Sequence, residues 1–150
     1  MTHLLSVFER LLLTLWVGGL WITGYLVVPA LFASLDNRML AGELAGNVFS
    51  AMSWVGLACG GLLFAGVLLR ERSRSLMAWR LWVLAAMLAI VAIGLFALQP
   101  QMQLLKVQGI GPGSVQAIAF GRLHGVSSAL FLINSVLGLL LVGAGMRASR

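Results

Sequence analysis

Glu43 and His124 are the two side chains whose chemistry stands out most in this chain. Each opens a long apolar segment, at the edge of what a bilayer would cover. A carboxylate is stabilised at the positive N-terminal end of a helix, and an imidazole titrates near neutral pH. If their two helices are neighbours, Glu43 and His124 can share a proton or bind a metal ion such as copper. The alternative is that both are interfacial residues, with Glu43 paired to Arg38 or Arg122.

Five further polar residues are candidates for the lining of a polar pocket: Tyr25, Asn47, Gln99, Arg122 and Asn134. Polar groups inside a membrane bundle are costly unless they are paired or solvated, so they point to function by default. Asn134 lies near the middle of the last apolar segment. It either lines a path for a small solute or makes an interhelical hydrogen bond, which is worth only ~0.6 kcal/mol on average.

The sequence does not firmly imply any cofactor. The two histidines, His3 and His124, lie at opposite ends of the predicted bundle, which excludes bis-histidine haem ligation within one subunit. Cys59 is the single cysteine, and no Met-x-x-Met or Cys-x-x-Cys cluster favours copper. No set of nucleophile, base and acid indicates an enzyme. A haem-binding redox protein is therefore the weakest of the alternatives.

Four long apolar segments must position these residues. The chain is 61% hydrophobic and only 9% charged, whereas soluble domains carry about 25% charged residues. We predict an all-α integral membrane four-helix bundle, forming one domain over residues 1–150, because each segment can span ~30 Å of hydrocarbon. An amphipathic lead-in covers 1–10, and a flexible loop covers 102–114. The aliphatic third helix is expected to be the most lipid-exposed of the four predicted helices, 11–33, 44–69, 77–98 and 123–146.

The distribution of basic residues predicts the orientation of these helices. The net charge is +6, but the basic residues lie between the apolar segments, which argues against a nucleic-acid partner. Three of them fall on one predicted side and seven on the other, namely Arg10, Arg70, Arg72, Arg74, Arg80, Arg147 and Arg150. The positive-inside rule then places the N- and C-termini in the cytoplasm. We expect a multi-pass protein of the bacterial inner membrane, with the lipid bilayer as its main partner.

Small residues recur on one face of the second segment. Helices in lipid associate through close backbone approach, which small side chains at spacings of three and four allow. Gly18 is expected to contribute to the matching face of the first helix. This pattern also suits a homo-oligomer or a larger membrane complex. The residues of the predicted packing face are Gly42, Gly46, Ser50, Ser53, Gly56 and Gly60.

Three stretches of the chain resemble the bacterial branch of the transmembrane protein 205-like domain family. They are Leu15–Gly19 running on to Pro29–Phe32, Ala41–Gly46 with Phe49, and Phe120–Gly125 with Ser127 and Asn134. The start of the first stretch is more distantly similar to the membrane domain of copper resistance protein D. The resemblance implies a four-helix fold, a membrane location and a hint of metal handling. It supplies no catalytic residues.

Two functions follow from the sequence. The first is an accessory or scaffolding membrane protein that packs through its glycine stripes. The second is a protein that handles a metal ion or small solute through a site around Glu43 and His124 on the outer side.

Overall fold

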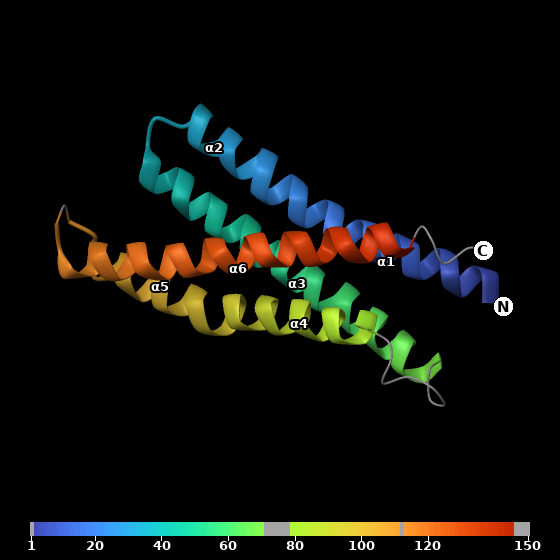
Figure 1. The fold of residues 1–150 in the computed structure, drawn as a ribbon. Helices are drawn as coiled ribbons and strands as arrows, with labels where there is room; N and C mark the ends of the chain where they lie inside the picture. The colour runs from blue at the N-terminus through green and yellow to red at the C-terminus, as the bar shows by residue number, and fades with distance from the viewer. Residues whose placement is uncertain (1, 71–78, 112, 146–150) are drawn as a thin grey trace.

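A computed structural model describes residues 2–70, 79–111 and 113–145, and in these ranges the chain is helical without any strand. Four apolar rods are each long enough to cross a membrane, as predicted (Figure 1). Two of the rods are continuous helices, and the other two are interrupted by a π-helical turn. In chain order the elements are α1 (Thr2–Ile22), η1 (Thr23–Val27), α2 (Val28–Ser34), α3 (Arg38–Arg70), α4 (Trp79–Ile93), η3 (Gly94–Leu98), α5 (Gln99–Val107) and α6 (Val115–Gly145).

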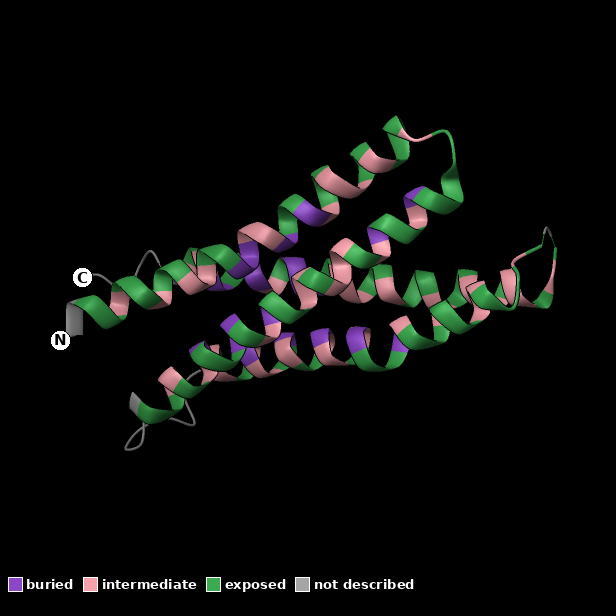
Figure 2. Cartoon of the chain, turned by 180° about the vertical axis from the view of Figure 1, so that it is seen from behind, coloured by how far each residue is buried: buried purple, intermediate pink, exposed green. Residues whose placement is uncertain are grey.

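The rods pack as the four corners of a bundle. α1 and α4 each pack against both α3 and α6, so α3 and α6 occupy opposite corners. The start of α1 and the end of α6 lie at the same end of the bundle (Figure 1). We call the opposite end, where α2 joins α3 and α5 leads to α6, the distal end. There the α2–α3 hairpin diverges from the α5–α6 hairpin in both views (Figures 1 and 2).

Two helices begin earlier than the apolar segments predict. α3 starts at Arg38 instead of residue 44, because Asn37 Oδ1 accepts hydrogen bonds from the N–H groups of Met39 (3.0 Å) and Leu40 (3.1 Å). α6 starts at Val115 instead of residue 123. Its cap is Ser114, whose Oγ accepts a hydrogen bond from the next turn. Polar caps, which hydropathy ignores, set both boundaries.

The remaining boundaries differ for related reasons. The predicted lead-in belongs to α1, which is helical from Thr2 onward. The third rod runs past residue 98 to Val107, so residues 102–107 of the predicted loop 102–114 are helical. Gly109, at φ 86°, ends it in a conformation that favours glycine. The predicted positions 77, 78 and 146 and residue 1 lie outside the described residues.

Each interrupted rod carries a proline two residues after its π turn. The Val28 N–H bonds to the Thr23 carbonyl, five residues back, just before Pro29. The Gln99 N–H bonds in the same way to Gly94, just before Pro100. Proline has no N–H and crowds the preceding turn, and the wider π turn accommodates both effects. The distortion beside Pro29 therefore takes the form of a π turn, and the helical rod continues past Pro100.

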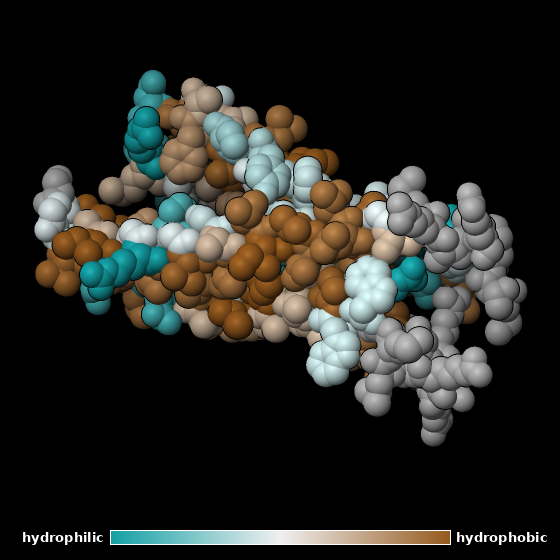
Figure 3. Space-filling view, in the orientation of Figure 1, coloured by the Kyte–Doolittle hydropathy of each residue, from teal (hydrophilic) through white to brown (hydrophobic). Residues whose placement is uncertain are grey.

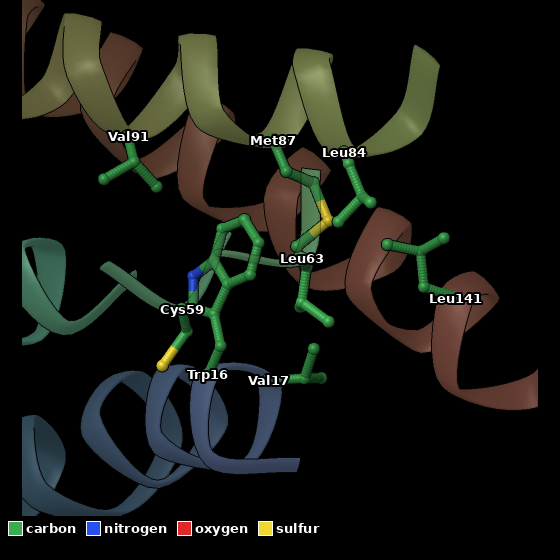
Figure 4. Close-up of a cluster of buried hydrophobic side chains, with 8 residues drawn as sticks. All are labelled: Trp16, Val17, Cys59, Leu63, Leu84, Met87, Val91 and Leu141. Atoms are coloured by element: carbon green, nitrogen blue, oxygen red, sulfur yellow. The ribbon is translucent and has the colours of Figure 1, made fainter. Parts of the chain in front are cut away.

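The core lies in the half of the bundle nearer the termini (Figure 4). Trp16, 1% exposed, projects from α1 toward α4, where Met87 is fully enclosed. Leu84 and Val91 of α4 are buried as well. The expectation that the third predicted helix is the most lipid-exposed is therefore wrong, because one face of an aliphatic helix can be core while the other meets lipid.

Apolar side chains also cover the outside of the bundle, as lipid requires. Hydrophobic residues fill the middle of the face in Figure 3, and many hydrophilic residues gather at the distal end. Buried positions form narrow stripes along the inner sides of the helices (Figure 2). A surface of this kind has no stable environment in water.

Two glycines of α3 make room for the Trp16 ring. A methyl group at Gly56 would lie 2.6 Å from Nε1 of Trp16. A methyl group at Gly60 would lie 2.6 Å from Cζ3 of Trp16 and 2.7 Å from Cδ2 of Leu88. Gly61, the next residue, faces open space. The notch formed by Gly56 and Gly60 thus lets α1 approach α3 closely, which is how helices gain packing energy in lipid.

Gly60→Ala tests this notch, with Gly61→Ala as the matched control. Overpacking typically costs ~1–3 kcal/mol, so we expect Gly60→Ala to lower the free energy of unfolding by that amount. Gly61→Ala should not lower it, because the added methyl group meets open space and alanine is the better helix former. Reversible unfolding in mixed detergent micelles measures both values. Equal effects of the two variants would contradict the notch.

Candidate functional site at the distal end

The structure does not bring Glu43 and His124 together. Both are exposed, on α3 and α6, which occupy opposite corners of the bundle. The His124 ring stacks on Phe120 of its own helix, with ring centroids 6.0 Å apart and planes 7° apart. Within the described ranges, no ion pair links Glu43 to Arg38 or Arg122. The described residues thus give Glu43 neither of its expected ion-pair partners, and the shared site with His124 stays a prediction.

The described residues also contain no group of three or more His, Cys, Asp or Glu side chains that could hold a metal ion. Zinc sites in proteins normally take three or four protein ligands of this kind. A metal site at His124 and Glu43 therefore stays a prediction from the sequence. It would need further ligands, such as water or a second molecule.

Lys106 is the cation that links the two distal hairpins. Its Nζ donates a hydrogen bond of 3.3 Å to the Gly42 carbonyl on α3, and it lies 5.8 Å from the centroid of the Phe120 ring on α6. One side chain on α5 thereby contacts both α3 and α6. The sequence prediction placed Lys106 in the loop 102–114, because the third apolar segment ends near residue 98. Pro100 could have indicated that a helix starts there, because proline is well tolerated in the first turn of a helix.

A cluster of four aromatic rings lies between the distal end and the core. Trp21 and Tyr25 contact each other, Tyr25 contacts Phe131, and Phe131 contacts Phe49, with centroid separations of 5.4 to 5.6 Å. The Trp21 indole N–H also donates a hydrogen bond of 3.4 Å to the Ser135 carbonyl. This aromatic cluster joins the first rod, α3 and α6.

The five pocket candidates do not line one pocket. Asn47 and Arg122 are exposed on α3 and α6. Tyr25 is 49% exposed and belongs to the aromatic cluster. Gln99 is partly buried where η3 meets α5. Asn134 alone is enclosed, at 2% exposure, and its Oδ1 has no hydrogen-bond partner.

The predicted packing residues fall on different partners. Gly56 and Gly60 face Trp16, whereas a methyl group at Gly46 would lie 3.7 Å from Gln103 of α5, and one at Gly42 would lie 3.9 Å from Phe32 of α2. Ser53 Oγ donates a hydrogen bond to the Phe49 carbonyl, 2.8 Å away, and Ser50 is partly buried. A methyl group at Gly18 would meet no atom within 4 Å. The close approach of the first rod to α3 instead uses Trp16.

Sequence reasoning missed the role of Gly24. A methyl group there would collide with the Phe131 ring, lying 2.6 Å from Cε1. The phenyl ring therefore fits against the bare backbone of the π turn η1. A glycine beside a proline-linked kink was the available signal for such close contact.

Gly24→Ala should destabilise the bundle by ~2 kcal/mol, within the range for overpacking of a tight contact. Phe131→Leu should restore part of that loss, giving a coupling energy above ~0.5 kcal/mol in a double-mutant cycle. Gly18→Ala, on the same rod but in open space, is the control and should not destabilise the bundle. Strict additivity of Gly24→Ala and Phe131→Leu would show that the two residues do not interact.

Elemental analysis decides the metal prediction. If His124 binds a metal ion, protein purified without chelator carries metal in stoichiometric amount, and His124→Ala lowers it at least tenfold, since a lost ligand typically costs more than a lost second-shell partner. Arg122→Ala, two residues away and exposed, is the control. Equal metal content in wild type and His124→Ala would exclude the site.

Comparison with known proteins gives one match. A family described as "Domain of unknown function (DUF4149)" matches residues 11–110, which is two thirds of the chain. The matched region begins within α1 and extends past the end of α5, so it includes both prolines that follow a π turn. No curated protein and no solved structure matches the chain.

Proposed function

The chain belongs to the DUF4149 family, whose function is unknown, and from this premise we propose that it is an accessory membrane protein that binds a transmembrane helix of another protein. The polar residues of the distal end do not form a common site. The outside of α6 offers a helix-packing surface instead.

The observation that carries the proposal is a bare patch on α6. Gly121 and Gly125 are both exposed, and a methyl group at either would meet no atom within 4 Å. They stand four residues apart, so they lie one above the other on the same face. Ser128 continues this face, and it too is exposed. We call Gly121, Gly125 and Ser128 the α6 patch.

This spacing is the one by which helices approach closely in lipid. Inside the bundle, Gly56 and Gly60 show the same spacing with a partner in place, the Trp16 ring. Glycine in a helix interior lowers intrinsic helix stability by ~1 kcal/mol relative to alanine. A bare pair such as Gly121 and Gly125 is consistent with a partner helix that recovers this loss.

Site-specific crosslinking in native membranes tests the proposal. A photoreactive amino acid at Gly125 should give a defined adduct with another membrane protein. Gly121→Leu in the same chain should reduce the yield at least fivefold, because a bulky side chain prevents close approach. The mass of the adduct separates a second copy of this chain from a different protein.

Leu62, an exposed residue on α3, provides the matched control position. A photoreactive group there should give only lipid adducts. If position 125 crosslinks no more than position 62, the α6 patch faces lipid and the proposal is wrong. A self-adduct alone would replace the accessory role with a homo-oligomer.

The location and orientation of the chain are also part of this proposal. We place the protein in the bacterial inner membrane, with both termini in the cytoplasm, on the basis of its arginine distribution. The resemblance to the transmembrane protein 205-like family supports a membrane location. The more distant likeness to the membrane domain of copper resistance protein D adds only the hint of metal handling.

A further inference from the structure

The buried polar side chains of the bundle lie at a similar height along it. Within the described part of the chain they are Thr23, Asn134 and Ser135, with exposures of 6%, 2% and 1%. Two contacts fix their relative height: Trp21 donates to the Ser135 carbonyl, and Gly24 meets Phe131. The π turn η1 and the middle of α6 therefore share one level of the membrane.

Asn134 is the unsatisfied member of this group. Its Oδ1 is fully enclosed without a hydrogen-bond partner, whereas Ser135 Oγ donates to the Phe131 carbonyl at 2.9 Å. A side-chain amide can accept two hydrogen bonds and donate two. Leaving such a group unpaired in an apolar interior costs more than a typical hydrogen bond contributes.

The surroundings of Asn134 do not supply a partner. It lies one turn from Gly138, on the same helix face, and Gly138 packs against Val17 and Met87. The buried residues at the next level of α1 and α4 are Leu20 and Val91. These side chains have no polar hydrogen to donate, except through their own helical backbone.

The η1 turn reduces the number of main-chain donors near the same level. The Val28 N–H bonds to the Thr23 carbonyl, and Pro29 has no N–H. The carbonyls that follow Thr23 therefore have fewer main-chain donors within reach than an unbroken α-helix supplies. In lipid, such carbonyls need donors from elsewhere.

The hydrogen-bonding groups at this level determine which kind of molecule could bind beside them. Among the described acidic side chains, Glu9 lies 14 residues before Thr23, Asp36 lies between α2 and α3, and Glu43 lies in the second turn of α3. A bare cation beside Thr23 and Asn134 would therefore have no adjacent counter-charge. A small neutral molecule that both donates and accepts hydrogen bonds fits the groups present. Buried water, which typically makes about three hydrogen bonds, is such a molecule.

We propose that Asn134 and Thr23 hold a water molecule inside the membrane-spanning bundle, next to the η1 turn. The water donates to Asn134 Oδ1 and to a carbonyl freed by the π turn, and the Thr23 hydroxyl is its third contact. This site is independent of the α6 patch, so its success or failure does not bear on the proposed accessory role.

Water-edited solid-state NMR on uniformly labelled protein in lipid bilayers tests the site. The chain has three asparagines, and Asn37 and Asn47 are exposed, so their side-chain amides serve as wet references. The Asn134 amide should receive magnetisation from water at a rate within about threefold of theirs. The Leu63 backbone amide, in the apolar core, is the dry reference.

Two variants and one control show which side chains are responsible for the transfer from water. Asn134→Leu assigns the amide resonance by removing it. Thr23→Val should slow the transfer to Asn134 at least threefold, whereas Thr14→Val, at an exposed threonine of the same rod, should leave it unchanged. If magnetisation from water builds up on the Asn134 amide of the wild type as slowly as on Leu63, the site is dry and the proposal fails. Transfer unaffected by Thr23→Val would remove Thr23 from the site, and with it the site as proposed.

Discussion

The bundle depends on the close approach of α1 to α3, where the Trp16 ring fits against Gly56 and Gly60. Lipid tails are as apolar as leucine, so burying apolar area does not by itself hold membrane helices together. What holds them is contact density, and a large flat ring against bare backbone provides it. Met87 closes the other side of the same core, which ties the third rod to the first through one contact region (Figure 4).

The distal half follows a different rule, that backbone polar groups in lipid must find partners. Proline interrupts two rods at matching places, and each interruption becomes a π turn. Trp16 and Met87 each stand seven residues before these turns, so the first and third rods present the same pattern of core residue, π turn and proline. Beyond the turns the hairpins diverge, and Lys106 bridges them through the Gly42 carbonyl. The half of the bundle near the termini is thus held by close packing. In the distal half, the π turns accommodate the prolines, and Lys106 donates to a backbone carbonyl.

Function is harder to locate than the fold because the polar residues are dispersed. His124 stacks on Phe120, Glu43 lies on the opposite corner, and Asn134 is enclosed. Family membership gives no activity to test against this geometry. Two features remain that an ordinary bundle does not need: the bare glycines of the α6 patch and the unpaired amide of Asn134. The α6 patch faces outward and could pack against a partner helix. The amide of Asn134 faces inward and could bind a water molecule.

Hydropathy and segment length were enough to predict a membrane bundle of four apolar helices, because both act before any tertiary contact forms. The sequence also indicated that glycines of α3 pack closely. It misjudged the helix ends, since Asn37 and Ser114 act through single hydrogen bonds. The placement of α3 and α6 on opposite corners, which separates Glu43 from His124, became visible only in the packed bundle. Periodicity defines the faces of one helix, but the order of helices around a bundle depends on how all four surfaces fit together.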